Sequence, residues 1–299
     1  MTKENHCFEA SNYLKLNYND EEKNDFAVCV KGYIFEKSHS AKLIEWIELL
    51  SILGVRKIFI YELGGDPDVR KVLDYYIEKG ILDVVKTSLP GHINFIHPEY
   101  LKNHLHLQRI DGQIQLNDCL YRNIDKYRYI ATIDIDEVII PSTFGHRWSD
   151  MITSVSNKYP NSDFYLFQNT YFFDNVNEYH PSLDNVTDIP NTNHMLQHVY
   201  RSVGYSKGKS LFKTEYVKRV DSHRPRDCID RPCDGSIVSS KIAHVNHYRN
   251  GCQLHVGTKE QCYEKFYKNV TMDTRLWEFK EELVLSSKKV LSKLGLAEL

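Results

Sequence analysis

The chain has 299 residues and a mass of 35.1 kDa, which is enough for one large domain with a sizeable core. Its 38 Lys and Arg residues nearly balance its 40 Asp and Glu residues, so no global basic charge predicts binding to nucleic acid or to an anionic membrane. A hydrophobic content of 41%, with 20 Tyr and 13 Phe, excludes an intrinsically disordered chain.

Residues 1–25 are polar and contain an acidic run at positions 20–22, without the apolar core of a signal peptide. The most apolar stretch of helical length, residues 43–55, is interrupted by Glu45 and Glu48, so the sequence predicts no transmembrane helix. We therefore expect an N-terminal polar extension at 1–25 before a single domain at 26–299. The protein is either cytoplasmic or lacks its targeting segment in this chain.

The first ninety residues alternate short apolar runs with helical patterns. Strands are predicted at 26–30, 57–61 and 81–85, and helices between about Ser40 and Gly54 and between Asp66 and Gly80. Asp66 can cap the second helix, and Pro67 suits its first position. Strand and helix alternating with short links predict right-handed β-α-β units and a parallel sheet.

A long loop is predicted at 90–109 and a helix at about 110–124, followed by an apolar, β-branched stretch at 129–141 that predicts a strand. Three acids, Asp134, Asp136 and Glu137, interrupt the middle of this stretch. Buried acids are costly unless something pairs them. In an open parallel sheet such groups belong at the carboxyl edge of the strands, where ligands bind.

Asp134 and Asp136 offer two carboxylates of the kind that bind Mg²⁺ or Mn²⁺, whose coordination shells substrate phosphates and water usually complete. Asp66 and Asp68 have the same spacing but lie at a helix start, where acids need no ligand. The context therefore favours a metal and diphosphate site at Asp134 and Asp136, with a structural acid cluster as the alternative.

Residues 142–299 are less regular. Helices are predicted at 148–159 and 277–294, strands at 164–167 and within 209–220, and a loop at 174–195. No internal repeat or low-complexity linker divides the chain, which favours one domain.

The seven cysteines form no C-x-x-C pair, which argues against a zinc ribbon. Cys228 and Cys233 lie close together, with Cys252 and Cys262 not far behind. Two disulfides among them in an oxidising compartment are one interpretation, and free thiols in a reducing compartment are the other. Cys119 is expected to be buried or disulfide-bonded rather than a nucleophile. Glycosylation sequons at 185–187 and 269–271 would matter only in a secretory protein.

The sequence around the acidic stretch resembles the core signature of glycosyltransferase family 92. The matching segments are 114–122 and 129–141 at the core, 29–32, 43–48, 53–55 and 59–61 upstream, and 209–210, 223–225 and 245–249 downstream. The resemblance covers about residues 26–270.

This resemblance implies a GT-A fold: a Rossmann-like, mostly parallel sheet with flanking helices and an irregular acceptor-binding second half. Residues 26–141 would form the nucleotide-sugar half and 142–299 the acceptor half. Family members are inverting, metal-dependent enzymes that mostly transfer galactose from UDP-galactose to a hydroxyl of a glycan. Those of animals are typically anchored in the Golgi by one N-terminal helix, which is absent from this chain. The resemblance therefore places the protein in the Golgi lumen or membrane, with the cytoplasm as the alternative.

The resemblance also implies a metal site. Asp134 and Asp136 would hold Mn²⁺, or Mg²⁺, against the diphosphate, and Glu137 would orient the ligands. His247 is the candidate for a third ligand, because Mn²⁺ accepts an imidazole beside carboxylates more readily than Mg²⁺ does. His244 is its competitor.

Donor contacts are expected from Asp134, Lys31, Asn117 and Arg122, the last three with an ordinary surface role as the alternative. Asp174 follows an aromatic run that suits a sugar ring, and it is the candidate catalytic base.

Asp221 and His223 are rivals for the role of catalytic base. His194 and His198 have helical spacing but lack the glutamate of a zinc protease, so no role is predicted for them.

Two other functions stay open at this point. One is a different metal-dependent α/β enzyme acting on nucleotides, such as a nucleotidyltransferase or phosphatase. The other is a non-catalytic sugar-binding homologue. The identity of the acceptor does not follow from the sequence.

Overall fold

The computed structural model describes residues 22–35, 39–88, 105–143, 145–183, 186, 188–202, 206–252 and 258–296. Most of the predicted extension at 1–25, residues 90–104 of the predicted loop at 90–109, and positions 185 and 187 of the first sequon lie outside these residues. None of the helices in the described part of the chain is both long and apolar enough to span a membrane.

The first half of the chain forms the parallel part of the main sheet, as predicted. Its strands are β1 (Asn24–Phe35), β2 (Lys57–Gly65), β3 (Leu82–Lys86) and β4 (Tyr127–Thr132), in the order β4-β1-β2-β3. Helices α1 (His39–Ile52) and α2 (Pro67–Glu78) make the first two crossovers. The side chain of Asp66 accepts a hydrogen bond from the Asp68 N–H at 2.8 Å, which confirms the predicted cap.

Helix α4 (Leu105–Asn123) begins five residues before the predicted start at 110, so the loop prediction is wrong for 105–109. Leucines at 105 and 107 are good helix formers, but the neighbouring His and Asn residues gave this segment the composition of a loop.

The stretch predicted as one strand at 129–141 is two strands. β4 ends at Thr132, β5 (Glu137–Pro141) begins at Glu137, and the four residues between them form a turn. β5 pairs antiparallel with β12 (Ala243–Arg249). A continuous strand would have buried Asp134 and Asp136 in the sheet, whereas the turn leaves their side chains 26% and 42% exposed.

The second half adds mostly short strands around β6 (Phe164–Phe173), which extends six residues beyond its predicted end. These are β7 (Tyr200–Ser202), β8 (Ser206–Lys213), β11 (Gly235–Ile237), β12 and β13 (Val270–Met272), with a separate hairpin of β9 (Val217–Val220) and β10 (Pro225–Cys228). β8 runs antiparallel to both β4 and β6, and β12 runs parallel to β6. The carboxyl ends of β1, β4, β6 and β12 therefore meet at one edge of the sheet.

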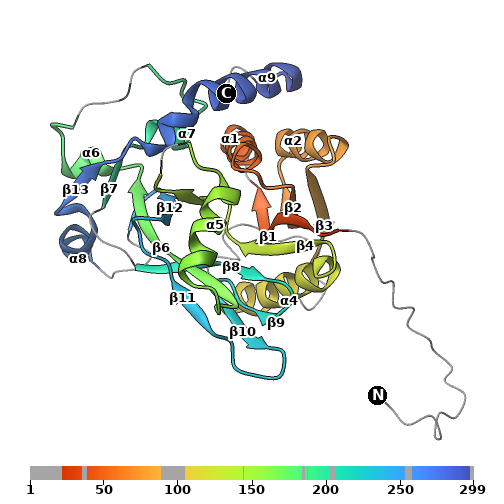
Figure 1. Ribbon diagram of the computed structural model, residues 1–299. Helices are drawn as coiled ribbons and strands as arrows, with labels where there is room; N and C mark the ends of the chain where they lie inside the picture. The colour runs from red at the N-terminus through yellow and green to blue at the C-terminus, as the bar shows by residue number, and fades with distance from the viewer. Residues whose placement is uncertain are drawn as a thin grey trace, which may run out of the picture.

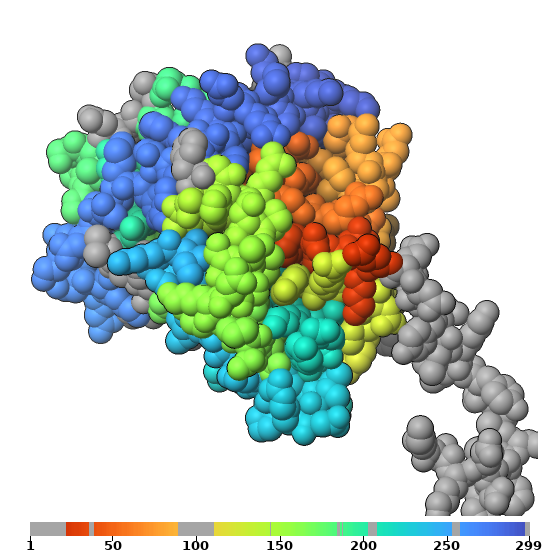
Figure 2. Space-filling view, viewed as in Figure 1, coloured from red at the N-terminus to blue at the C-terminus, as the bar shows by residue number. Residues whose placement is uncertain are grey.

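Helices cover both faces of this sheet (Figure 1). α1, α2, α5 (Trp148–Lys158) and α9 (Lys280–Leu294) contribute to the largest apolar core, whereas α4 and the β9–β10 hairpin pack on the other face. α9 follows a 3₁₀ turn (Arg275–Phe279) and ends at Gly295, whose φ of 67° suits glycine. In the space-filling view the blue residues of α9 lie against the orange residues of α1 and α2 (Figure 2).

The loop predicted at 174–195 contains two one-turn helices, α6 (Val176–Tyr179) and α7 (His194–Gln197), the second of which ends just beyond it. α6 packs at the far end of the sheet near α8 (Lys259–Cys262) and a π turn (Tyr263–Tyr267). In the part of the chain that the structure describes, three disulfides join Cys29 to Cys119, Cys228 to Cys233, and Cys252 to Cys262. The four neighbouring cysteines thus form two disulfides, and the third bond ties α4 to β1.

Candidate functional site

The turn between β4 and β5 gathers three carboxylates, Asp134, Asp136 and Glu137, which we call the acidic cluster. One oxygen from each lies within 4.8 Å of the others. The Asp134 N–H donates to Glu137 Oε2 at 3.0 Å, and the Glu137 N–H donates to the Asp134 carbonyl oxygen at 3.0 Å. The indole of Trp46 on α1 donates to the Glu137 carbonyl oxygen at 2.8 Å. These bonds hold the carboxylates at the carboxyl edge of the sheet.

Two lysines neutralise part of the acidic cluster. Lys31 Nζ on β1 lies 2.7 Å from Asp134 Oδ1. Lys209 on β8 is only 1% exposed, and its Nζ lies 2.9 Å from both Asp134 Oδ2 and Glu137 Oε2. Three carboxylates face two ammonium groups, so the lysines by themselves offset only part of the negative charge. The role of Lys209 was not predicted, although its position lies in a segment that carried the family resemblance.

The lysines determine the protonation of Asp134. Burial by itself would raise the pKa of Asp134, but the charges of Lys209 and Lys31 outweigh it and hold the pKa well below its ordinary value. The same balance applies to Asp136: burial acts to raise its pKa, and the charge of His247 lowers it. Both carboxylates are therefore ionised at neutral pH and can bind a cation.

His247 on β12 adjoins the acidic cluster, because β12 pairs with β5 in a register that places His247 opposite Glu137. Its Nε2 lies 3.3 Å from Asp136 Oδ2, and its Nδ1 lies 3.1 Å from Glu137 Oε1. Carboxylates thus lie beside both ring nitrogens, and a metal at Nε2 would replace the proton shared with Asp136 while Glu137 holds Nδ1. His244 instead contacts Arg275, with 3.2 Å between its Nδ1 and the guanidinium, at the far end of β12.

Of the other residues predicted to contact the sugar donor, one lies at the acidic cluster and two have partners elsewhere. Lys31 touches the acidic cluster, whereas the side chain of Asn117 on α4 bonds to the backbone N–H and carbonyl of Val220 at 2.9 Å each. Arg122 pairs with Asp118 one turn earlier on the exposed side of α4. The structure brings Lys31 to the cluster, and donor contacts from Asn117 and Arg122 stay predictions.

Asp174 follows the last residue of β6 and lies in a second cluster, which we call the Asp174 cluster: Asp174, His194, His198 and Lys42. Asp174 Oδ1 is 2.9 Å from His194 Nε2 and 3.3 Å from His198 Nε2. Lys42 Nζ on α1 lies 3.8 Å from Asp174 Oδ2. The two histidines, for which no role was predicted, thus belong with the predicted base.

The rival candidates have other partners. Asp221 is held by Arg226 and by the backbone N–H of Ser222. His223 donates from Nδ1 to the Gly208 carbonyl oxygen at 2.8 Å, and burial lowers its pKa. Asp221 Oδ2 already accepts a bond from the Arg226 Nε at 2.9 Å, which makes it a weak proton acceptor.

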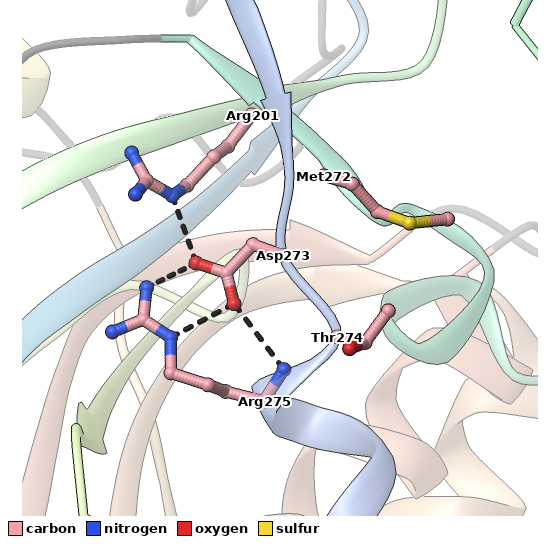
Figure 3. Close-up of a pocket in the computed structure, with 5 residues that line it drawn as sticks. All are labelled: Arg201, Met272, Asp273, Thr274 and Arg275. Carbon is pink, nitrogen blue, oxygen red and sulfur yellow. Dashed lines mark hydrogen bonds and ion pairs between the residues drawn. The ribbon is translucent and has the colours of Figure 1, made fainter.

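A cavity of about 500 Å³ is lined by residues outside the acidic cluster (Figure 3). Arg201, Met272, Asp273, Thr274 and Arg275 line it, and Asp273 lies between the two guanidinium groups. Burial would raise the pKa of Asp273, but the hydrogen bond and charge of Arg275 lower it to about 2. Because the carboxylate and the arginines satisfy one another, we interpret this cavity as a structural ion-pair network.

Comparison with known proteins points to one enzyme family. The family model described as glycosyltransferase family 92 matches residues 24–285. The protein beta-1,4-galactosyltransferase galt-1 of Caenorhabditis elegans is 29% identical over 128 residues, which are 41% of this chain and 27% of that protein. The match therefore spans about a quarter of that relative's length.

Solved structures show a more distant likeness. S. aureus TarS 1–349 in complex with UDP-GlcNAc is 13% identical with a TM-score of 0.38, over 80% of this chain and 64% of that chain. The same protein in complex with UDP is 11% identical with a TM-score of 0.37, over 75% of this chain and 60% of that one.

Proposed function

Because the chain belongs to glycosyltransferase family 92, we propose that it transfers a hexose from a UDP-sugar to a hydroxyl of a glycan, with inversion at the anomeric carbon. We propose galactose as the sugar, which agrees with the name of the distant nematode relative. The observation that carries the proposal is the acidic cluster, held between two lysines and a histidine at the carboxyl edge of the sheet.

The donor atoms fit a divalent cation. Asp136 has a side chain that is 42% exposed, and His247 Nε2 lies 3.3 Å from its carboxylate. Carboxylate oxygen together with imidazole nitrogen suits Mn²⁺ better than Mg²⁺. We propose that Asp134, Asp136 and His247 hold this cation, with Glu137 orienting the imidazole. When bound, the cation would offset the negative charge that develops on the departing diphosphate.

The remaining groups bind and orient the substrates. Lys31 is half-buried at the cluster, so its ammonium can contact a phosphate oxygen while it stays beside Asp134. The aromatic rings of Tyr171 and Phe173 stack with their centroids 5.7 Å apart, and Tyr171 lies 5.1 Å from the His247 ring. We propose that the half-buried ring of Tyr171, backed by the buried ring of Phe173, contacts a sugar ring and that Asp174 belongs to the group that deprotonates the acceptor.

We further propose that the protein works in the lumen of the secretory pathway. Three disulfides support this location, because they persist in oxidising compartments. Asn269, in the second sequon, is exposed just before β13 and is therefore accessible for glycosylation.

The test is a screen for UDP release from UDP-galactose, UDP-glucose and UDP-GlcNAc, with Mn²⁺ or with excess EDTA, first in water and then with a glycan panel. We expect release with Mn²⁺ and a sugar preference for galactose. Asp136→Asn should abolish release, while Asp68→Asn, in the motif of the same spacing on α2, should leave it unchanged. Full activity of Asp136→Asn or activity in EDTA would contradict the metal site. Release of pyrophosphate or free phosphate would indicate a different nucleotide enzyme.

A further inference from the structure

The histidines of the Asp174 cluster have defined tautomers. A carboxylate only accepts hydrogen bonds, so the 2.9 Å contact requires a proton on His194 Nε2. A neutral His194 therefore has its lone pair on Nδ1, and this atom has no hydrogen-bond partner among the residues that the structure describes. His198 Nδ1 lies 2.6 Å from the carbonyl oxygen of His194, which likewise only accepts, so His198 carries its proton on Nδ1.

The carboxylate of Asp174 is already occupied. Oδ1 accepts from His194 and faces His198, and Oδ2 faces the ammonium of Lys42. Burial would raise the pKa of Asp174, but the hydrogen bond and charge of His194 outweigh it and bring the pKa to about 2. A carboxylate with these partners is a poor proton acceptor and a good anchor for an imidazole.

Helix α7 is held firmly although it is a single turn. The buried carboxylate of Glu45 on α1 accepts hydrogen bonds from the N–H groups of Met195 at 2.8 Å and Leu196 at 3.2 Å. From the other side the Trp277 indole donates to the Leu196 carbonyl oxygen at 3.0 Å. These contacts fix the position of His194 relative to the sheet.

The Asp174 cluster lies beside the acidic cluster. The Tyr248 N–H donates to the Asp136 carbonyl oxygen at 2.8 Å, and the Asp174 N–H donates to the Arg249 carbonyl oxygen at 2.9 Å. The two carboxylate-bearing segments are thus attached to consecutive residues of β12, on its two flanks. One flank offers cation ligands, and the other offers a hydrogen-bonded histidine.

Building on the proposed function, we propose that His194 is the catalytic base, that Asp174 orients it, and that His198 positions both. As the acceptor oxygen forms its bond to the anomeric carbon, its proton moves to His194 Nδ1. The bond from the anomeric carbon to the diphosphate oxygen breaks, and its electron pair leaves with UDP. The imidazolium formed is stabilised by the Asp174 carboxylate and later releases its proton to water.

The experiment measures kcat for UDP release from UDP-galactose at saturating Mn²⁺ and donor, with water and with the best acceptor of the panel. His194→Gln should lower kcat by about 10²–10⁴-fold while the affinity for UDP with Mn²⁺ stays within about twofold of the wild type. His146→Gln, a half-buried histidine outside both clusters, is the matched control. Added imidazole should restore part of the activity of His194→Ala, which a merely structural role would not allow.

The pH profile separates base from positioning residue. The wild-type rate should fall as the pH decreases, because protonation of His194 Nδ1 removes the lone pair that accepts the proton. The ionisable groups facing His194 are Asp174 after β6, His198 on α7, Lys42 and Glu45 on α1, and Tyr248 on β12.

The residual rate of His194→Gln should lack this acidic limb. His198→Gln should lose less activity than His194→Gln and should keep the fall in rate at low pH.

Three outcomes are distinguishable. Full activity and an unchanged pH profile in His194→Gln would overturn this inference and leave the proposed function intact. No UDP release by the wild type from any UDP-sugar would overturn the proposed function itself. A Co²⁺ titration in which His194→Gln and His198→Gln each lose one of two bound ions would show that the histidines are metal ligands, and would also overturn the inference.

Discussion

Removing the buried ammonium of Lys209 tests how the acidic cluster is held together. Lys209→Met keeps the length and apolar character of the side chain but deletes the charge that bridges Asp134 and Glu137 at 2.9 Å each. Burial alone would lower the pKa of Lys209, but the two carboxylates raise it, so the wild-type ammonium is charged throughout the physiological range. Removing one partner of a buried ion pair costs about 3–5 kcal/mol, because the other charges are left unpaired.

Urea unfolding at pH 7 measures this loss. The matched control is Lys213→Met on the same strand, whose ammonium lies over two tyrosine rings and should change the unfolding free energy by less than about 1 kcal/mol. The pKa of Asp134 is lowered in the folded wild type, so its contribution to stability is present at neutral pH and is lost as the pH falls. Wild type and Lys209→Met should therefore converge in acid. A loss below about 1 kcal/mol at pH 7, or a difference that persists in acid, would refute the reasoning.

Three further changes test the surroundings of the two clusters. Burial raises the pKa of Glu45 from 4.5 to about 7. Its contribution to the unfolding free energy therefore falls as the pH rises through that interval, by at most about 3 kcal/mol. Glu45→Gln should lack this pH dependence when urea unfolding is measured at pH 5 and pH 8. Replacing Cys29 and Cys119 by serine removes the bond between β1 and α4 and should cost about 2–5 kcal/mol, measured in the same way, and an equal stability would contradict it. Glu137→Gln should weaken Mn²⁺ binding about 10–100-fold by releasing the His247 ring, measured by Mn²⁺ titration in the presence of UDP.

The parallel half of the sheet could be predicted because its signals are local. The apolar runs of β1, β2 and β3 and the cap at Asp66 lie within a few residues of what they specify. The second half depends on distant partners. All but the last residue of β12 are buried, yet His244, Asn246 and His247 give it the composition of a loop. Its strand character comes from pairing with β5 and β6, more than seventy residues earlier.

The two clusters also differ in how local their sequence signals are. Asp134 and Asp136 lie two residues apart in an apolar stretch, so their role was visible in the sequence. His194 is twenty residues from Asp174, on a helix too short to show a periodicity. Its position follows from the bond between Glu45 and the backbone of α7, which no local pattern reveals. A buried glutamate in the apolar face of α1 was the one available signal.

β12 explains why the two clusters can have different chemistry at such short range. Its His247 faces the acidic cluster and the ring of Tyr171, while the next residue, Tyr248, stacks on Phe172 and lies 6.1 Å from the ring of His194. Alternate side chains of a strand point to opposite faces, so β12 directs His247 to the acidic cluster and Tyr248 to the Asp174 cluster, and both clusters meet at its carboxyl end. An inverting transfer needs the leaving diphosphate and the incoming hydroxyl on opposite sides of the anomeric carbon. In the proposed reaction the cation ligands and the proton acceptor belong to different clusters, so the charge that each develops is balanced by its own partners.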